Sequence, residues 1–126
     1  MATTATVRGV PTSELLGECR HIAWTLALGE SGEWQAFTEF AERSVQFGGS
    51  FSGGASVKIE GSNDLTSPST ANTLHNPFTN DLILRTVGTF DHIAEMPLWI
   101  RPVVIGGDVS TAITINLVVR RQGHGK

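Results

Sequence analysis

The sequence has little that could fix its fold or its function by covalent chemistry. It contains one cysteine, Cys19, so no disulfide can form within the chain and the fold must be stable without that cross-link. A single cysteine fits assembly in a reducing cytosol. The first residues lack the apolar core of a secretory signal, no run approaches the length of a membrane span, and no N-glycosylation acceptor motif occurs. We therefore expect an unprocessed, soluble chain.

Charge is also scarce. Charged residues make up 17% of the 126 residues, and the 9 basic and 12 acidic side chains give a formal net charge of −3. No basic run is longer than Arg120–Arg121, so the electrostatic footprint of a nucleic-acid-binding protein is missing. The length suits one domain, residues 1–126, with a core of its own. The low charge indicates a chain that buries much of its surface, in part against other chains.

A pattern of β-strands is present instead, and it is clearest in Ser44–Asp64. Apolar and polar residues alternate over 45–47 and again over 56–60, which is typical of a sheet with one buried face. The connection between these two arms contains glycines that suit tight turns: Gly48, Gly49, Gly53 and Gly54. The turn-forming residues 61–64 end the second arm. We predict a β-hairpin at the centre of a β protein.

Further strands are expected at Cys19–Leu28, Asp81–Val87, Leu98–Ile105 and Thr111–Arg121. The last of them alternates most regularly, with a buried face made of Ile113, Ile115, Leu117 and Val119. Pro102 cannot donate a backbone hydrogen bond, so it is expected at a strand edge or a bulge. About seven or eight short strands with Gly- and Pro-rich turns predict an all-β fold. We expect a single antiparallel β-sandwich over 19–121, with jelly-roll or Greek-key connections.

Other segments are less regular. Residues 34–40 fit a strand or a loop closing on the sheet, which their aromatic and Thr content favours, although their spacing also fits a helix. Phe90–Met96 fits a short helical turn or a loop. Residues 1–12 are expected to form an extended arm, either disordered or ordered on a neighbouring subunit. A short helical turn is expected at Thr12–Leu16 and a frayed tail at 122–126.

No catalytic or cofactor-binding constellation is complete in the sequence. The glycine-rich connection lacks the Lys-Ser/Thr pair of a phosphate-binding loop, and Phe51 stands where a nucleophile elbow needs serine. Cys19 and His21 share a strand face, but two ligands are too few for a zinc site. Asp91–His92 and Glu95 could supply an acid–base pair but lack a nucleophile, so we interpret them as solvated. We expect no enzymatic activity, no metal and no cofactor.

The 3 tryptophans raise the alternative of a carbohydrate platform, because aromatic faces stack on sugars. Trp24 and Trp99 lie inside alternating strands, so core packing is the better interpretation for both. Trp34, beside Glu33, is expected to be the most exposed of the three and to lie at a contact. A carbohydrate-binding β-sandwich therefore stays an alternative function.

Three segments within residues 43–121 carry a likeness to a known family: RSVQFGGSFSGGASVKIEGSND, TVGTFDHI and PLWIRPVVIGGDVSTAITINLVVRR. Their order resembles small tailed-phage virion proteins that decorate or cement the capsid. The resemblance implies a jelly-roll-like sandwich, present in many copies, that assembles in the host cytoplasm and binds the outer surface of the major capsid protein shell. It implies the major capsid protein and copies of itself, as a dimer or trimer, as partners, without nucleic acid or membrane. It brings no catalytic residues.

Subunit contacts are expected at the exposed tips of the sandwich and in the N-terminal arm. The candidate contact residues are Val7, Val10, Trp34, Phe51, Asn63 and Asp64. Another phage structural part, in the tail or the head–tail connector, is an alternative to the capsid decoration protein. The number of copies per particle separates these two possibilities.

Overall fold

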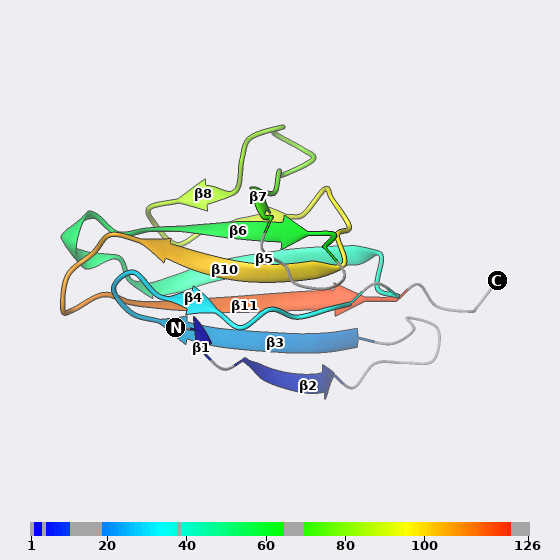
Figure 1. Cartoon of the computed structure of the whole chain (residues 1–126), viewed down its shortest axis with the longest axis horizontal. Helices are drawn as coiled ribbons and strands as arrows, with labels where there is room; N and C mark the ends of the chain where they lie inside the picture. Colours follow the sequence, from blue (N-terminus) through cyan, green and yellow to red (C-terminus); the bar gives the residue numbers. More distant parts are fainter. Residues whose placement is uncertain (1, 4, 11–18, 38, 65–69, 122–126) are drawn as a thin grey trace.

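Two β-sheets pack face to face around one apolar core in the computed structural model of the protein (Figure 1). The structure describes residues 2–3, 5–10, 19–37, 39–64 and 70–121. The strands are β1 (Ala2–Thr3), β2 (Thr6–Val10), β3 (Cys19–Leu26), β4 (Ser31–Gly32), β5 (Glu42–Ser50), β6 (Ser56–Ser62), β7 (Asn72–Thr73), β8 (Leu84–Arg85), β9 (Phe90–His92), β10 (Trp99–Ile105) and β11 (Ala112–Arg120), with a 3₁₀ turn, η2 (Ser52–Gly54), after β5. The prediction of an all-β sandwich is confirmed.

The strand order is that of a jelly roll. One sheet has the order β1-β4-β10-β6-β7, with β8 also paired to β6, and the other has the order β2-β3-β11-β5-β9. From β3 to β11, consecutive strands lie in opposite sheets, except that β6, β7 and β8 share one sheet. The short β1–β4 pair is parallel, and the other strand pairs named here are antiparallel. Such interleaving of two sheets is the double Greek key of a jelly roll.

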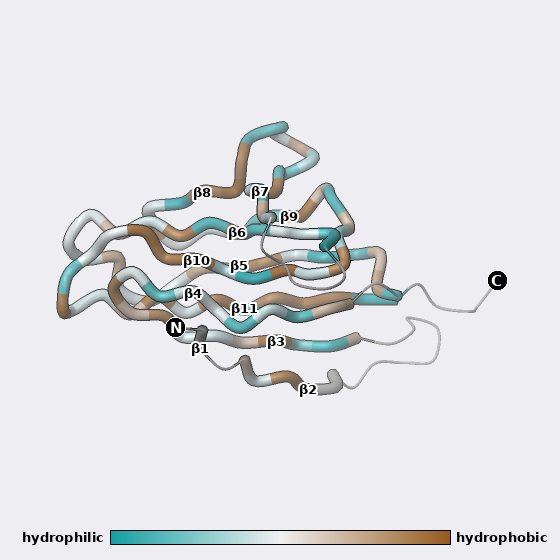
Figure 2. The backbone as a smooth tube through the Cα atoms, viewed as in Figure 1, coloured by the Kyte–Doolittle hydropathy of each residue, from teal (hydrophilic) through white to brown (hydrophobic). Residues whose placement is uncertain are grey.

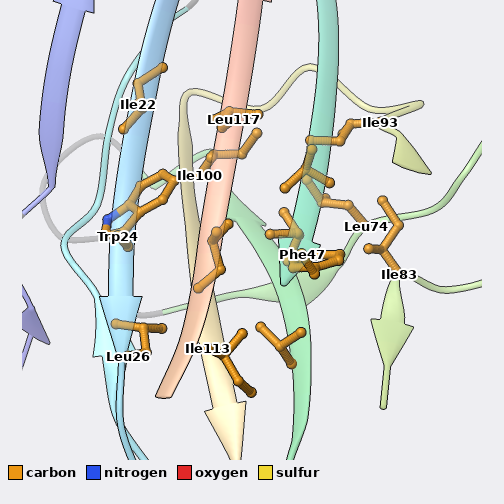
Figure 3. Close-up of a cluster of buried hydrophobic side chains, with 14 of the residues drawn as sticks. Ile22, Trp24, Leu26, Phe47, Leu74, Ile83, Ile93, Ile100, Ile113 and Leu117 are labelled. Carbon is orange, nitrogen blue, oxygen red and sulfur yellow. The ribbon is translucent and has the colours of Figure 1, made fainter. Parts of the chain in front are cut away.

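The core lies between the sheets and comes from strand alternation. On β11 the residues predicted for the buried face, Ile113, Ile115, Leu117 and Val119, are all at most 1% exposed. Ile115 pairs with Trp24 of β3 and with Phe47 of β5, so these three side chains form one row of the core. Ile100 of β10 meets them from the opposite sheet (Figure 3). Burying such side chains stabilises the fold by about 1.5–3 kcal/mol each.

The central stretch is not a hairpin, and this prediction is wrong. β5 pairs with β11 and β9 in one sheet, whereas β6 pairs with β10, β7 and β8 in the other. The connection 51–55 therefore crosses from one sheet to the other over the end of the core, where Ala55 is buried. Alternation shows which face of a strand is buried, but it carries no information about which strand lies beside it.

The N-terminal residues are extended, as predicted for the arm, but they pair with this chain's own sheets. β1 lies beside β4, with Ala2 opposite Ser31, and β2 lies beside β3, with Val7 opposite Ile22. Ala5, between the two strands, packs against the core. The segment therefore contacts both sheets of the same chain instead of projecting from it. The helical turn expected at Thr12–Leu16 and the frayed tail at 122–126 lie outside the described residues.

Several boundaries differ from the expected ones. The strand predicted at Asp81–Val87 is reduced to β8, and the segment Phe90–Met96 contains β9 followed by a loop. Leu28, expected on a buried face, lies beyond the end of β3 and is 49% exposed. Residues 34–37 run along the sheet edge, as favoured, and the bridge between Gln35 and Ile100 fixes them to β10. Glu39 then lies in a turn, and the Phe40 N–H donates to the Phe37 carbonyl oxygen.

Pro102 lies opposite a bulge, as predicted. Ser31 pairs with Val103 and Gln35 pairs with Ile100, so 4 steps along residues 31–35 face 3 steps along β10. On this side of β10 the N–H groups of Ile100 and Val104 donate to Gln35 and Glu30, so the bulge spans the position at which the proline has no N–H to donate. A side chain on Gly32 would approach the proline ring to 2.7 Å, so glycine is required at this bulge.

Candidate interaction surface at the loop end

Four loops meet at one end of the sandwich, the left end in Figure 1. They are residues 27–30 between β3 and β4, 51–55 between β5 and β6, 86–89 between β8 and β9, and 106–111 between β10 and β11. The jelly-roll order brings them together, because antiparallel strands that alternate between the sheets make their crossings at the same ends. We call these four segments the loop end.

Hydrogen bonds join two of these loops. Ser52 donates through Oγ to Asp108 Oδ1 at 2.6 Å, and Thr111 donates through Oγ1 to the Ser52 carbonyl oxygen at 3.0 Å. The Asp108 carboxylate also accepts from the Ser110 backbone N–H, and the Asp108 N–H donates to Thr111 Oγ1. The hydrogen bond from Ser52, followed by that from Ser110, lowers the pKa of Asp108 below its ordinary value. Loops 51–55 and 106–111 therefore form one rigid unit.

Glycine lets the two loops approach this closely. Gly53 has a φ of 71°, in the region that favours glycine. A Cβ on Gly53 would lie 2.7 Å from the backbone nitrogen of Asp108, so any side chain would push the loops apart. Gly54, with a φ of 73°, has open space around the same position. Of the four glycines that the sequence assigned to a hairpin turn, Gly53 is the one that contact between these two loops requires.

The loop end presents apolar side chains to solvent. Val109, at the tip of loop 106–111, is 97% exposed, and Val87 is 61% exposed. Leu28 and Ile105 are about half exposed at the same end, where short hydrophobic stretches alternate with neutral and hydrophilic ones in Figure 2. The four loops contain the acidic residues Glu30 and Asp108 and no Lys or Arg. A rigid apolar tip with acidic neighbours suits contact with a protein surface better than contact with a polyanion.

The structure separates the predicted contact residues. Phe51 lies at the loop end, but its ring is half-buried and packs against the core. Val7 is 46% exposed on the edge strand β2. Val10 pairs with Cys19 through its backbone, and its side chain lies outside the described residues. Asn63 and Asp64 lie at the opposite end, on the rim of an open hollow of about 860 Å³.

Asn63 and Asp64 are used within the chain. Asn63 Oδ1 accepts the Leu98 backbone N–H at 2.9 Å, and the Asp64 carbonyl oxygen accepts the indole N–H of Trp99 at 2.9 Å. Trp99 was expected in the core, and that expectation is wrong. It is half-buried, and it lies on the face of β10 opposite to the buried side chains of Ile100, Pro102 and Val104. Trp24 is in the core as predicted, at 2% exposure.

Trp34 lies on the outer face of the β4–β10–β6 sheet and is half-buried. The guanidinium of Arg101 covers its ring at 4.4 Å from the centroid, and Arg101 Nε donates to Glu60 at 3.1 Å. Burial would raise the pKa of Glu60, but hydrogen bonds and charge from Lys58 and Arg101 outweigh it and lower that pKa. One face of Trp34 is therefore already occupied by a side chain of this protein.

The expected acid–base residues do not converge. Asp91 is 3% exposed and accepts from Arg85, Asn76 and Thr89, so its interpretation as a solvated residue is wrong. Burial would raise the pKa of Asp91, but the Arg85 and Asn76 hydrogen bonds and the Arg85 charge lower it. Glu95 binds His75 Nδ1 at 2.6 Å, away from His92. Both carboxylates are thus held in ion pairs within the fold. The burial of Asp91 could not be recognised from its polar character in the sequence.

Candidate metal ligands are also dispersed. Cys19 is buried as a free thiol, and His21 is hydrogen-bonded to Asn116 Oδ1 at 2.8 Å. Within the part of the chain that the structure describes, no group of three or more His, Cys, Asp and Glu side chains could hold a metal ion. Across the same residues, no helix is long and apolar enough to cross a membrane.

Sequence reasoning missed Val109, the most exposed apolar side chain of the loop end. Gly106–Gly107–Asp108 are residues typical of a turn, but the valine that follows them belongs to no alternating pattern. The signal was an apolar residue placed between Asp108 and Thr111, whose side chains fix the turn around it by hydrogen bonds.

Comparison with known proteins identifies a shared fold. No protein-family model matches the chain, and no curated protein is significantly similar to it in sequence. The crystal structure of the SPBc2 prophage-derived protein YomS is similar, with a TM-score of 0.54 and 15% identity over 91% of each chain. Peruvianin-I, a cysteine peptidase from Thevetia peruviana latex, aligns with a TM-score of 0.41 and 13% identity, over 96% of this chain and 64% of its own. The first likeness shows that a prophage-derived protein has this fold, and the second carries no argument.

Proposed function

We propose that this chain is a structural protein of a phage particle, which decorates the capsid by seating its loop end on the major capsid protein shell. The observation that carries the proposal is Val109, which is 97% exposed on a turn fixed by the Ser52, Asp108 and Thr111 hydrogen bonds. Val109 stands with the exposed side chains of Val87, Leu28 and Ile105 at the same end. A group of exposed apolar side chains on a rigid support is typical of a binding site, because little conformational freedom is lost on contact.

The fold supports this proposal by analogy. A prophage-derived protein shares the jelly roll, although a fold does not fix a function. Many copies on a symmetric shell would let modest contacts add to a stable coat through multivalency. Catalysis is a poor alternative for a separate reason: the Asp91 carboxylate is paired with Arg85, and the Glu95 carboxylate is paired with His75. We propose no enzymatic activity.

Two alternatives are weaker. A tail or connector component would use the same fold, and its copy number per particle would be small where a decoration protein has many. A carbohydrate platform on Trp34 is disfavoured, because the Arg101 guanidinium covers one ring face. If Trp34→Ala abolished retention on immobilised glycans, the carbohydrate alternative would replace the proposal.

A binding assay with shells that lack this chain tests the proposal. The purified wild-type chain is expected to bind such shells, and Val109→Asp is expected to weaken binding about 10- to 100-fold, the cost of losing one buried valine. The matched control is Met96→Asp. Met96 is also an exposed apolar residue, at 61%, but it lines the hollow at the opposite end. It is expected to bind like wild type.

Both variants change exposed side chains, so their thermal unfolding should match that of the wild type. Failure of the wild type to bind would overturn the assignment as a decoration protein. Loss of binding in Met96→Asp with full binding in Val109→Asp would show that the docking surface is at the other end.

A further inference from the structure

A second group of exposed apolar side chains lies on β9 and in the turn 76–80. Phe78, Phe90 and His92 form an aromatic patch, in which Phe78 is 77% and Phe90 is 62% exposed. The Phe78 ring meets the His92 ring edge to face at 4.8 Å between centroids, and Phe90 lies 6.2 Å from His92. Two large exposed phenylalanines around one imidazole are a concentration of apolar surface that a monomer rarely exposes without use.

The patch has a built support. Phe78 lies in a turn in which Asn76 Oδ1 accepts the Phe78 N–H at 2.8 Å and the Asn76 carbonyl accepts the Asn80 N–H at 2.8 Å. Asn80 closes the turn with a φ of 62°. The buried amide of Asn76 then donates to Asp91 at 2.9 Å. The exposed Phe78 is thus connected through two hydrogen bonds to β9, which carries the other two members of the patch.

Asp91 connects this turn to β8. Arg85 donates to the Asp91 carboxylate through Nε at 3.0 Å and through Nη2 at 2.7 Å. A buried ion pair is a poor way to gain stability, since removal of two charges from water is costly. Its effect is to fix one arrangement of β8, β9 and the 76–80 turn. That arrangement orients the aromatic patch before any partner arrives, which lowers the entropy lost on binding.

Charge around the patch favours a copy of the same surface as the partner. The nearby carboxylates of Asp91 and Glu95 are paired within the chain with Arg85 and His75. Asp81, next to the turn that carries Phe78, also lies within the reach of the Arg85 charge, so each of these three carboxylates has a basic group of the same chain near it. Two such surfaces can therefore face each other with these charges largely balanced. The centres of protein interfaces are likewise depleted in charge and enriched in aromatic residues. Neither a polyanion nor a strongly charged protein finds a complement in this patch.

We propose that the aromatic patch of Phe78, Phe90 and His92 is a two-fold interface between two copies of this chain. An interface between two identical surfaces is arranged around a two-fold axis, so the dimer buries two copies of Phe78 and two copies of Phe90. Phe90 directly follows loop 86–89, whereas Val109 lies on loop 106–111 between other strands, so a dimer would present two Val109 tips to a shell.

Sedimentation velocity of the purified full chain, over a range of concentrations, tests this inference. The wild type is expected to dimerise at micromolar concentration, and Phe78→Ser and Phe90→Ser are each expected to raise the dimer dissociation constant at least about 100-fold, since each change acts at two places. Val109→Ser is the matched control, because it removes an exposed apolar side chain of the loop end. It is expected to leave the dissociation constant unchanged.

Thermal unfolding of the monomeric variants should stay within a few degrees of wild type, because both rings are largely exposed. A wild type that stays monomeric at the highest concentration would overturn the inference, and so would dimers that both serine variants leave intact. Dissociation by Val109→Ser would instead place the interface at the loop end. No shells are present in this assay, so its outcome is separate from that of the decoration proposal.

Discussion

The substitution Asp91→Asn tests how the buried network supports the fold. It keeps the size of the side chain and removes the charge of a carboxylate whose side chain is 4% exposed. The wild-type carboxylate accepts from Arg85, Asn76 and Thr89 at 2.7–3.1 Å. An asparagine would turn an amide donor toward other donors and leave the guanidinium of Arg85 without its counter-charge.

The expected cost follows from the burial of the pair. Loss of one partner of a buried ion pair destabilises a protein by about 3–5 kcal/mol. Arg85 is 20% exposed and can recover some hydration, so we expect the lower value, about 3 kcal/mol. In urea unfolding, with a slope of about 1.5 kcal/mol per molar, the midpoint should fall by about 2 M.

Glu42→Gln is the matched control, because it breaks the ion pair between Glu42 and Arg120, in which the side chains are 50% and 46% exposed. An exposed pair contributes at most about 1 kcal/mol, so its midpoint should fall by well under 1 M. The double variant Asp91→Asn with Arg85→Met should be more stable than Asp91→Asn alone, since no unpaired charge remains. If Asp91→Asn cost no more than Glu42→Gln, the reasoning about the buried network would be refuted.

Two further predictions concern pH and backbone. The lowered pKa of Asp91 means that its stabilisation is complete above the unfolded value of about 3.9 and is lost as the pH falls through the lower folded pKa, so urea unfolding between pH 7 and pH 2 should show a weaker acid dependence in Asp91→Asn than in wild type. Equal acid dependence would contradict this. Gly54→Ala should cost about 1 kcal/mol from its positive φ alone, whereas Gly53→Ala should cost about 2–4 kcal/mol, because its Cβ would also strike the backbone of Asp108. Equal midpoints for the two alanine variants would show that the loops are not in close contact.

The strands with strict alternation could be predicted well from the sequence. Ile113, Ile115, Leu117 and Val119 all face the core, because a period of two residues with large apolar side chains has one stable placement in a sandwich. The bulge opposite Pro102 was likewise predictable, since a missing N–H restricts where a strand can pair. These features depend on local geometry alone.

The pairing of strands could not be predicted in the same way. β5 and β6 have the alternation and the glycine-rich connection of a hairpin, yet they lie in opposite sheets. The reason is that the connection crosses the core and is fixed by Asp108 and Thr111, which lie more than 50 residues later in the sequence. Contacts at such separation leave no periodic signal in the segment itself.

Side chains whose burial does not match their residue type were the hardest to identify. Trp99 follows the alternation of its strand but lies on the outer face, so its type suggested the core and its phase placed it outside. Asp91 looked like a solvated loop residue, and its burial depends on Arg85 and Asn76, which only the folded chain brings together. Val109 stands alone among polar turn residues, so its isolation is the signal and no periodic pattern marks it.

Whether the loop end seats this chain on a capsid shell can be seen in a cryo-electron microscopy map of a whole particle that contains the chain. We expect many copies on the outer surface of the shell, with loop 106–111 in contact with the major capsid protein. Copies confined to the tail or connector, or copies on the shell with Val109 facing solvent, would contradict this expectation.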